Sequence, residues 1–143
     1  MTLAIRDVPH DPRSAAAVRR ELSRELGARR VSADLTDDVE ILVSELVGNA
    51  VRYANPLPGG VLRIAWELAR NDEGHEVTLR VTDGGAIDAA GFPHQMDAPL
   101  DSETGRGLRI VATLASDWGV DTEAPGQSVW AVLRRKSTPL EVA

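Results

Sequence analysis

The strongest hydrophobic pattern in the 143-residue chain runs from Asp34 to about Ala54. Apolar residues recur there at spacings of three and four, the period of an amphipathic helix with a broad buried face. Asp34 or Thr36 can serve as the N-cap, and the Pro- and Gly-rich segment from Asn55 ends the pattern. The apolar positions of this predicted helix are Val39, Leu42, Val43, Leu46, Val47, Ala50, Val51 and Ala54.

A shorter helical pattern precedes it. Ser14 is a candidate N-cap for a helix that reaches about Leu26, with Gly27 as its stop. The apolar positions of this helix are Ala15, Val18, Leu22 and Leu26. The last three suit either the core or a contact with a partner or second copy, and we expect the core. Residues 2–8 alternate weakly and predict a short strand or an extended arm.

Alternating apolar positions predict two hairpins in the second half of the chain. The first joins residues 61–70 to a strand that ends at Asp83, across a turn at 71–74. The second joins 118–122 to 128–133 across a Pro-Gly turn. A third helix, opened by Gly105, lies between the two hairpins.

The order β-α-α-β-β-loop-α-β-β predicts an α+β fold. We expect a two-layer sandwich, with the helices on one face of a mixed, mainly antiparallel sheet. Residues 86–104 have no period and are rich in Gly, Pro, Asp and Ala, which is typical of a functional loop. The length favours a single domain over residues 1–143, with a loose tail from Ser137.

Composition narrows the classes of function. A net charge of −6 argues against nucleic-acid binding, and an aromatic content of 3% argues against a base-stacking surface. The chain has no cysteine, so disulfides, thiolate metal sites and cysteine nucleophiles are excluded. With no signal peptide or membrane span visible in the sequence, we expect a cytoplasmic protein with no membrane partner.

Glu45 and Asn49 lie four residues apart on the longer predicted helix, so their side chains share one face. Apolar residues flank them, and a buried carboxylate and amide need a partner such as a cation, a water or a phosphate. A solvated edge of an amphipathic helix would explain the same pair, because this spacing is common by chance.

Asp83-Gly84-Gly85 stands where a predicted strand ends. An aspartate there can accept a hydrogen bond from an amino group, and a glycine lets a ligand approach the backbone closely. An ordinary Asp-Gly turn would have the same sequence.

Gly105-Arg106-Gly107-Leu108 opens a predicted helix. Free backbone N–H groups and the helix dipole can hold a phosphate there, and Arg106 or Arg109 can add charge-assisted contacts. A flexible helix start with solvated arginines is the alternative.

Taken together and in this order, the three motifs resemble those of the GHKL ATPases, the family of gyrase, histidine kinases and MutL. Residues 45–54 look like the N box, 81–85 like the G1 box and 104–108 like the G2 box. The resemblance spans about residues 37–133 and is closest to the anti-sigma-factor serine/threonine kinases. It implies a Bergerat-type fold, ATP and Mg²⁺ as cofactors, a sigma factor and a STAS-domain anti-anti-sigma protein as partners, and a homodimer.

The resemblance also implies roles for the matched residues. Asn49 would bind a Mg²⁺ that bridges the phosphates, and Glu45 would be the general base toward a protein serine or would orient a water. Asp83 would receive the adenine amino group, with Gly85 lining the adenine pocket. Ser128, at the start of the last strand, would help to bind adenine through water.

The phosphates would be held by the G2 residues beneath a lid formed by residues 86–104. These residues are Gly105, Arg106, Gly107 and Leu108. Two positions depart from the family pattern. Ile87 stands where the G1 box often has another glycine, and Arg52-Tyr53 occupies the region where the N box often has a histidine.

The leading hypothesis is therefore a regulatory serine/threonine kinase that also binds a sigma factor. None of the three histidines lies in a predicted phosphoacceptor helix, which argues against a self-phosphorylating histidine kinase. The alternative is a non-catalytic, nucleotide-gated binding module, favoured by Ile87. A dinucleotide-dependent enzyme ranks lowest, because Ile110 stands at the third glycine position of a Gly-x-Gly-x-x-Gly motif.

Overall fold

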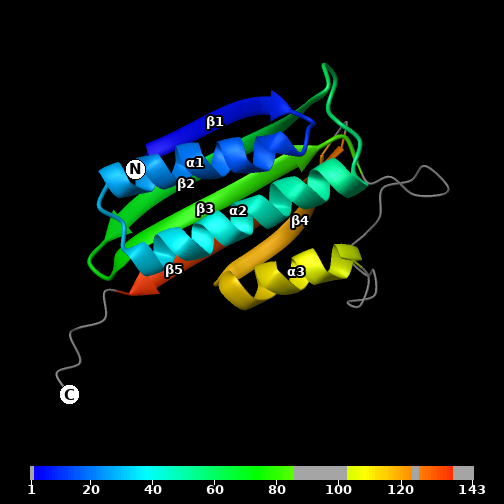
Figure 1. Ribbon diagram of the computed structural model, residues 1–143. Coiled ribbons are helices and arrows are strands. Elements are labelled where there is room, and N and C mark those ends of the chain that lie inside the picture. Colours follow the sequence, from blue (N-terminus) through cyan, green and yellow to red (C-terminus); the bar gives the residue numbers. More distant parts are fainter. Residues whose placement is uncertain (1, 86–102, 124–125, 137–143) are drawn as a thin grey trace.

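The computed structural model describes residues 2–85, 103–123 and 126–136, in which three helices cover one face of a five-stranded sheet (Figure 1). In chain order the elements are β1 (Thr2–Pro9), α1 (Arg13–Ala28), α2 (Ala33–Tyr53), β2 (Val61–Asn71), β3 (Gly74–Asp83), α3 (Glu103–Leu114), β4 (Asp117–Glu123) and β5 (Gly126–Lys136). The strand order is β1-β2-β3-β5-β4, and each neighbouring pair is antiparallel. The predicted two-layer α+β fold is confirmed, although the described pairings include no parallel pair.

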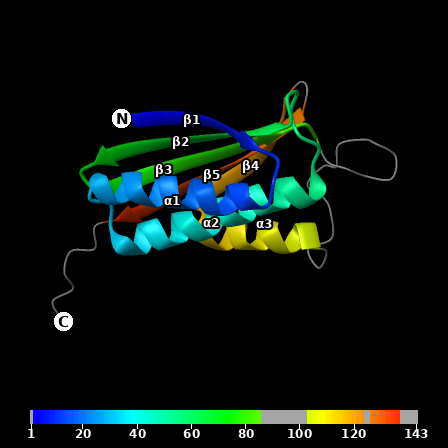
Figure 2. The same cartoon turned by 45° about the horizontal axis from the view of Figure 1, so that its top comes forward.

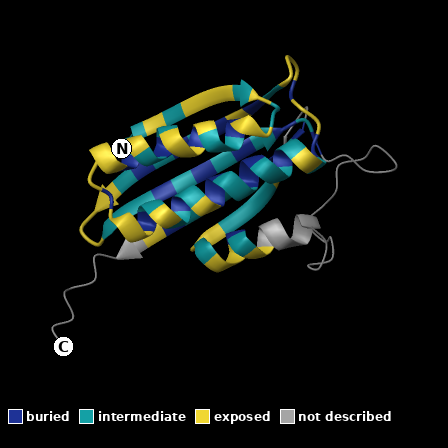
Figure 3. Ribbon diagram, viewed as in Figure 1, coloured by how far each residue is buried: buried dark blue, intermediate teal, exposed yellow. Residues whose placement is uncertain are grey.

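Helix α2 is the central helix of its layer. It packs between α1 and α3 and lies over β3 and β5 (Figures 1 and 2). Its inward face is buried along its length, as the apolar period predicts, while its outer face meets solvent (Figure 3). The helix that carries Glu45 and Asn49 is therefore fixed on both flanks and from below.

The core lies between the helices and one face of the sheet. Val18, Leu22 and Leu26 of α1 are all buried in it, which confirms the core role expected for them. Trp66 of β2 is the largest fully buried side chain, and its indole Nε1 donates a hydrogen bond to Glu25 at 3.0 Å. Burial of aliphatic and aromatic side chains of this size contributes roughly 1.5–3 kcal/mol each to folding.

The predicted ends of α1 were wrong at both termini. Ser14 lies inside the helix, after Arg13, and its hydroxyl donates to the carbonyl of Pro9 at 2.6 Å instead of accepting from the helix. Gly27 also lies within the helix, which ends at Ala28. Because the chain turns sharply there, Arg30 takes a positive φ of 59°, a region that non-glycine residues seldom adopt.

The N-cap of α2 is Ser32, so the expectation of Asp34 or Thr36 was wrong. The Ser32 side chain accepts a hydrogen bond from the backbone N–H of Leu35 at 3.2 Å. Ser32 has extended backbone angles directly before the first helical residue, which is the geometry that capping requires. Asp34 lies in the first turn, where its negative charge suits the helix dipole.

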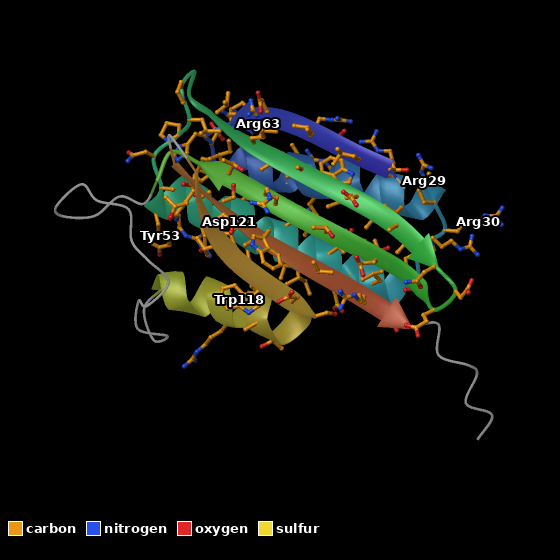
Figure 4. The ribbon with its side chains drawn as sticks, turned by 180° about the vertical axis from the view of Figure 1, so that it is seen from behind. Arg29, Arg30, Tyr53, Arg63, Trp118 and Asp121 are labelled. Carbon is orange, nitrogen blue, oxygen red and sulfur yellow. The ribbon has the colours of Figure 1, made fainter. Side chains whose placement is uncertain are left out.

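The far face of the sheet has no described helix over it (Figure 4). Ion pairs between strands cross this face. Asp7 pairs with Arg63 and Glu76 with Arg134 on neighbouring strands, and Arg80 of β3 reaches across β5 to Asp121 of β4. Leu3 and Ile5 of the edge strand β1 are exposed there. No helix among the described residues is long and apolar enough to cross a membrane.

Two predicted segments lie mostly or wholly outside the described residues. The loop predicted at 86–104 is described only at Glu103 and Thr104, which belong to α3. The tail from Ser137 is not described at all. Ile87, and with it the adenine-side departure from the G1 pattern, also lies outside the described part.

Candidate functional site

Asp83 is the last residue of β3 and points toward the helix layer. Side chains alternate along a strand, and Asp83 has the same parity as the buried residues Val77, Leu79 and Val81. Only 4% of Asp83 is exposed, so its carboxylate is a buried charged group at the end of a core strand. Such groups need hydrogen-bond partners, and they cluster at functional sites.

The Asp83 carboxylate is held in place by the two glycines that follow it. The backbone N–H of Gly85 donates to Asp83 Oδ1 at 2.7 Å. Gly85 has a φ of 100°, which only glycine adopts readily. Gly84 lies so close to the chain that a Cβ there would overlap the carbonyl of Pro56. The sequence Asp-Gly-Gly is therefore required by local geometry as well as suited to a ligand.

The segment after α2 pairs with these glycines. Asn55 N–H donates to the Gly85 carbonyl at 2.8 Å, and Gly84 N–H donates to the Asn55 carbonyl at 2.7 Å. These two bonds fasten the C-terminal end of α2 to the end of β3. They bring the Asn49 turn of the helix and the Asp83 carboxylate to the same end of the molecule.

Glu45 and Asn49 are both half-buried on α2. The carbonyl oxygen Oδ1 of Asn49 accepts a hydrogen bond from Arg52 Nη2 at 3.0 Å. The Arg52 guanidinium also lies over the ring of Tyr53, 5.6 Å from its centroid. An amide oxygen, a carboxylate and a cation thus share the last turns of α2, an arrangement that can bind a metal ion or an anion.

Gly105 and Gly107 lie in the first two turns of α3, which begins two residues before the predicted start. The N-terminal end of α3 lies at the same end of the molecule as the C-terminal ends of α2 and β3 (Figures 1 and 2). Its dipole therefore places partial positive charge at that end. The side chains of Arg106 and Leu108 lie outside the described part.

A family model for the histidine kinase-like ATPase domain matches residues 8–133 of the chain. This match spans all three motifs and most of the described elements. The chain belongs to the histidine kinase-like ATPase family. A comparison with curated protein sequences gave no match. Family membership makes this an ATP-binding domain.

Ser128 is not brought to this cluster. In the β3–β5 register Asp83 is opposite Gln127, while Ser128 is opposite Thr82, so the Ser128 side chain takes the other face of the sheet. There its Oγ lies 2.7 Å from Thr82 Oγ1. Gln127, which is half-buried, is the β5 residue that shares the face of Asp83 in this ATPase-family domain. The face on which Ser128 lies is set by the pairing of β3 with β5, and no local pattern in the sequence predicts this register.

His10 was also missed as a site residue. Its Nε2 lies 2.8 Å from the carbonyl of Ala54 and 3.1 Å from that of Ala50, at the C-terminal end of α2. Pro9 and Pro12 flank His10 in the sequence and predict only a break between strand and helix. A contact across 44 positions gives no periodic signal from which it could have been found.

Burial sets the electrostatics of the site. Loss of solvent around the carboxylate raises the pKa of Asp83 from the ordinary value of 3.8 to about 6. The hydrogen bond from Gly85 and the nearby charge of His10 act in the opposite direction but do not cancel the effect. Around neutral pH the carboxylate is mostly ionised, and it can accept a hydrogen bond from a ligand amino group.

Proposed function

We propose that this ATPase-family domain is a regulatory protein serine/threonine kinase of the anti-sigma-factor type. It would phosphorylate a STAS-like anti-anti-sigma partner and bind a sigma factor, as a homodimer. The observation that carries the proposal is the backbone ladder at Asn55, which joins the Asn49 end of α2 to the Asp83 end of β3. In this arrangement both groups lie at the same end of the molecule, where one nucleotide would contact them.

The adenine end of the nucleotide is assigned to Asp83. An ionised, desolvated carboxylate is a strong hydrogen-bond acceptor, and the adenine amino group is a matching donor. Gly85 presents backbone without a side chain next to it, so a flat base can approach. The phosphates are assigned to the start of α3, whose first two turns contain Gly105 and Gly107.

A magnesium ion at this site would be shared with the phosphates. The described residues contain no cluster of three or more His, Asp or Glu side chains that could hold a metal alone. Mg²⁺ in nucleotide sites usually keeps several waters and takes only one or two protein ligands, so the Asn49 amide oxygen is sufficient on the protein side. When bound, the ion would neutralise charge on the phosphates.

Glu45 is assigned the role of general base. It lies one helical turn before Asn49, so the two side chains project on the same side of α2. In the transfer step the serine oxygen of the partner forms a bond to the γ-phosphorus and the bond to the β,γ-bridging oxygen breaks. Glu45 takes the serine proton, and ADP leaves with the negative charge.

The described histidines support a serine/threonine substrate over autophosphorylation on histidine. His10 lies in the turn after β1, with its ring against α2, and His75 lies on β3. Neither belongs to a helix, whereas a phosphoacceptor histidine is expected on an exposed helix. His94 lies outside the described part.

Nucleotide binding is tested by titrating wild type and Asp83→Asn with ATP, with and without Mg²⁺. We expect the variant to bind at least about tenfold more weakly, the size of losing one charged hydrogen bond in a buried site. Asp72→Asn in the exposed β2–β3 turn is the matched control. Equal ATP affinity in Asp83→Asn and wild type would remove Asp83 from the site.

Kinase activity is tested with labelled ATP, Mg²⁺ and a candidate STAS protein. We expect label on a partner serine or threonine, lost in Glu45→Ala with ATP binding retained. Glu40→Ala, on the same helix and also half-buried, should transfer normally. ATP binding without transfer to any partner would instead support a nucleotide-gated binding module.

A further inference from the structure

We infer that His10 is a positioning residue of the nucleotide site, which fixes the end of α2 against the end of β3. The inference rests on the proposed nucleotide-binding function of that site. His10 belongs to the turn between β1 and α1, far in sequence from every motif of the site. Its ring nevertheless lies against the helix turn that follows Asn49.

The direction of these hydrogen bonds follows from their partners. Ala50 O and Ala54 O are carbonyl oxygens and can only accept, so Nε2 of His10 must carry the proton. Ala50 O also accepts the N–H of Ala54 at 3.1 Å, in the last turn of the helix. His10 therefore supplies a donor to helix-end carbonyls that the helix itself leaves without a full set of partners.

The anchored carbonyl leads directly into the site. Ala54 has left the helix for an extended conformation, and the next residue, Asn55, forms the two-bond ladder with Gly84 and Gly85. Gly85 in turn donates to the Asp83 carboxylate. The contacts thus run without a break from the His10 ring, through Ala54 and Asn55, to the proposed adenine acceptor.

The turn that carries His10 is itself fixed. The His10 backbone N–H donates to Gly60 O at 3.0 Å, just before β2. The ring therefore links the end of α2 to a turn that is itself hydrogen-bonded to the residue before β2. A positive charge on the His10 ring also favours the ionised Asp83, because it lowers the pKa of that carboxyl.

The test compares two substitutions in the full chain by ATP titration. His10→Gln keeps an N–H donor of similar reach, and His10→Leu removes it. We expect His10→Gln to bind ATP within about threefold of wild type and His10→Leu to bind about tenfold more weakly. His75→Gln, at the opposite end of β3, should not change affinity.

Amide hydrogen exchange supplies a second readout. Exchange at Asn55 and Gly85 should be faster in His10→Leu but not in His10→Gln. ATP affinity in His10→Leu equal to wild type, or an equal loss in both variants, would overturn the inference. Should His10→Leu not fold, nitrogen NMR of wild type at pH 8 decides the point. A proton on Nε2 supports the inference, and a bare Nε2 overturns it.

The two proposals fail in different ways. Wild type that binds no ATP would overturn the proposed function and, with it, the role of His10. Wild type that binds ATP normally while His10→Leu binds it equally well would overturn the inference alone.

Discussion

Individual residues at the site show a conflict between stability and ligand binding. The Asp83 carboxylate is 4% exposed and receives one described hydrogen bond, from Gly85. Burying an ionised group costs free energy of folding unless its partners replace the lost water. The residue proposed to bind the adenine amino group therefore lowers the stability of the folded chain when it is ionised.

Replacing Asp83 by Asn should stabilise the domain at neutral pH. The pKa of Asp83 is about 6 in the folded chain, against an ordinary value of 3.8, so the folded state binds this proton more tightly than the unfolded state does. The stabilisation that proton binding to Asp83 adds to the folded state is fully present below pH 4 and is lost as the pH rises through 6. We expect Asp83→Asn to raise the free energy of unfolding at pH 7 by about 1–2 kcal/mol.

Denaturant unfolding of both proteins between pH 4 and pH 8 measures this effect. The difference between Asp83→Asn and wild type should shrink as the pH falls from 7 to 4, because the wild-type carboxyl becomes neutral. Asp72→Asn should show no such trend. A variant that is less stable than wild type throughout this range would contradict the desolvation argument.

Arg52 places a second charge at the site. Its guanidinium donates at 3.0 Å to Asn49 Oδ1, the amide oxygen proposed to bind Mg²⁺. We expect Arg52→Gln to weaken ATP binding about five- to tenfold, because a charge-assisted contact is lost, while adenosine binding stays the same. Calorimetric titration of wild type and Arg52→Gln with ATP and with adenosine measures the change in each affinity.

Arg19→Gln, exposed on α1, is the charge-matched control for Arg52→Gln. Tighter ATP binding in Arg52→Gln would show instead that the guanidinium competes with the metal ion for the amide oxygen.

At the scale of elements, α2 matters most because it joins the core to the site. Its buried face packs on β3 and β5, and its last turns carry Asn49 and receive His10. Its start at Ser32 lies at the opposite end, 17 positions from Asn49 in a continuous helix. A change at the start can therefore alter stability without touching the site.

Ser32→Ala should cost about 1 kcal/mol of stability, because the backbone N–H of Leu35 loses its acceptor. ATP affinity at a temperature where the protein is folded should not change. Thr36→Ala, at the position that the sequence also favoured as a cap, should cost less. Denaturant unfolding measures both, and an equal cost in the two variants would contradict the assignment of Ser32 as the cap.

The close contact between the end of β3 and the segment after α2 can be tested by substituting Gly84. A methyl group on Gly84 would overlap the Pro56 carbonyl, so Gly84→Ala must displace backbone. We expect a loss of about 2–4 kcal/mol in unfolding free energy, together with loss of ATP binding. Gly27→Ala is the contrasting control, since nothing lies within 4 Å of its added Cβ and it should be neutral or slightly stabilising. Similar costs in both variants would contradict the close approach.

For the whole molecule, the apolar periods predicted the element order and the two layers correctly. They did so because α2, β2 and β3 each bury one face, and such an element has apolar residues at regular spacings in its sequence. Asn49 and Asp83 could be proposed as site residues because each lies in a motif a few residues long. Their roles stay predictions.

What the sequence could not supply is pairing between distant segments. Ser128 was assigned to the adenine side, but the β3–β5 register turns it away and presents Gln127 instead. His10 reaches α2 across 40 and 44 positions. Ser32, Asp34 and Thr36 are all good capping residues within five positions, and only the backbone angles select among them.

Ligand binding should also stabilise the complete molecule. Because the site draws on both helices and sheet, ATP should bind the folded chain and not the unfolded one. At one hundred times its Kd it should add about 2.7 kcal/mol to the unfolding free energy and raise the thermal midpoint. Thermal unfolding with increasing ATP measures this, and a midpoint independent of ATP would contradict binding at this site.

The Asn55 ladder has a consequence for synthesis of the protein. The ladder needs Gly84 and Gly85, so a nascent chain that has completed α1 and α2 still has no partner for Asn55. Such a chain already possesses the Asn49 turn but lacks the proposed adenine acceptor. If the proposed site binds ATP, the nucleotide would protect only chains in which β3 is in place, and unfinished chains would stay open to proteases.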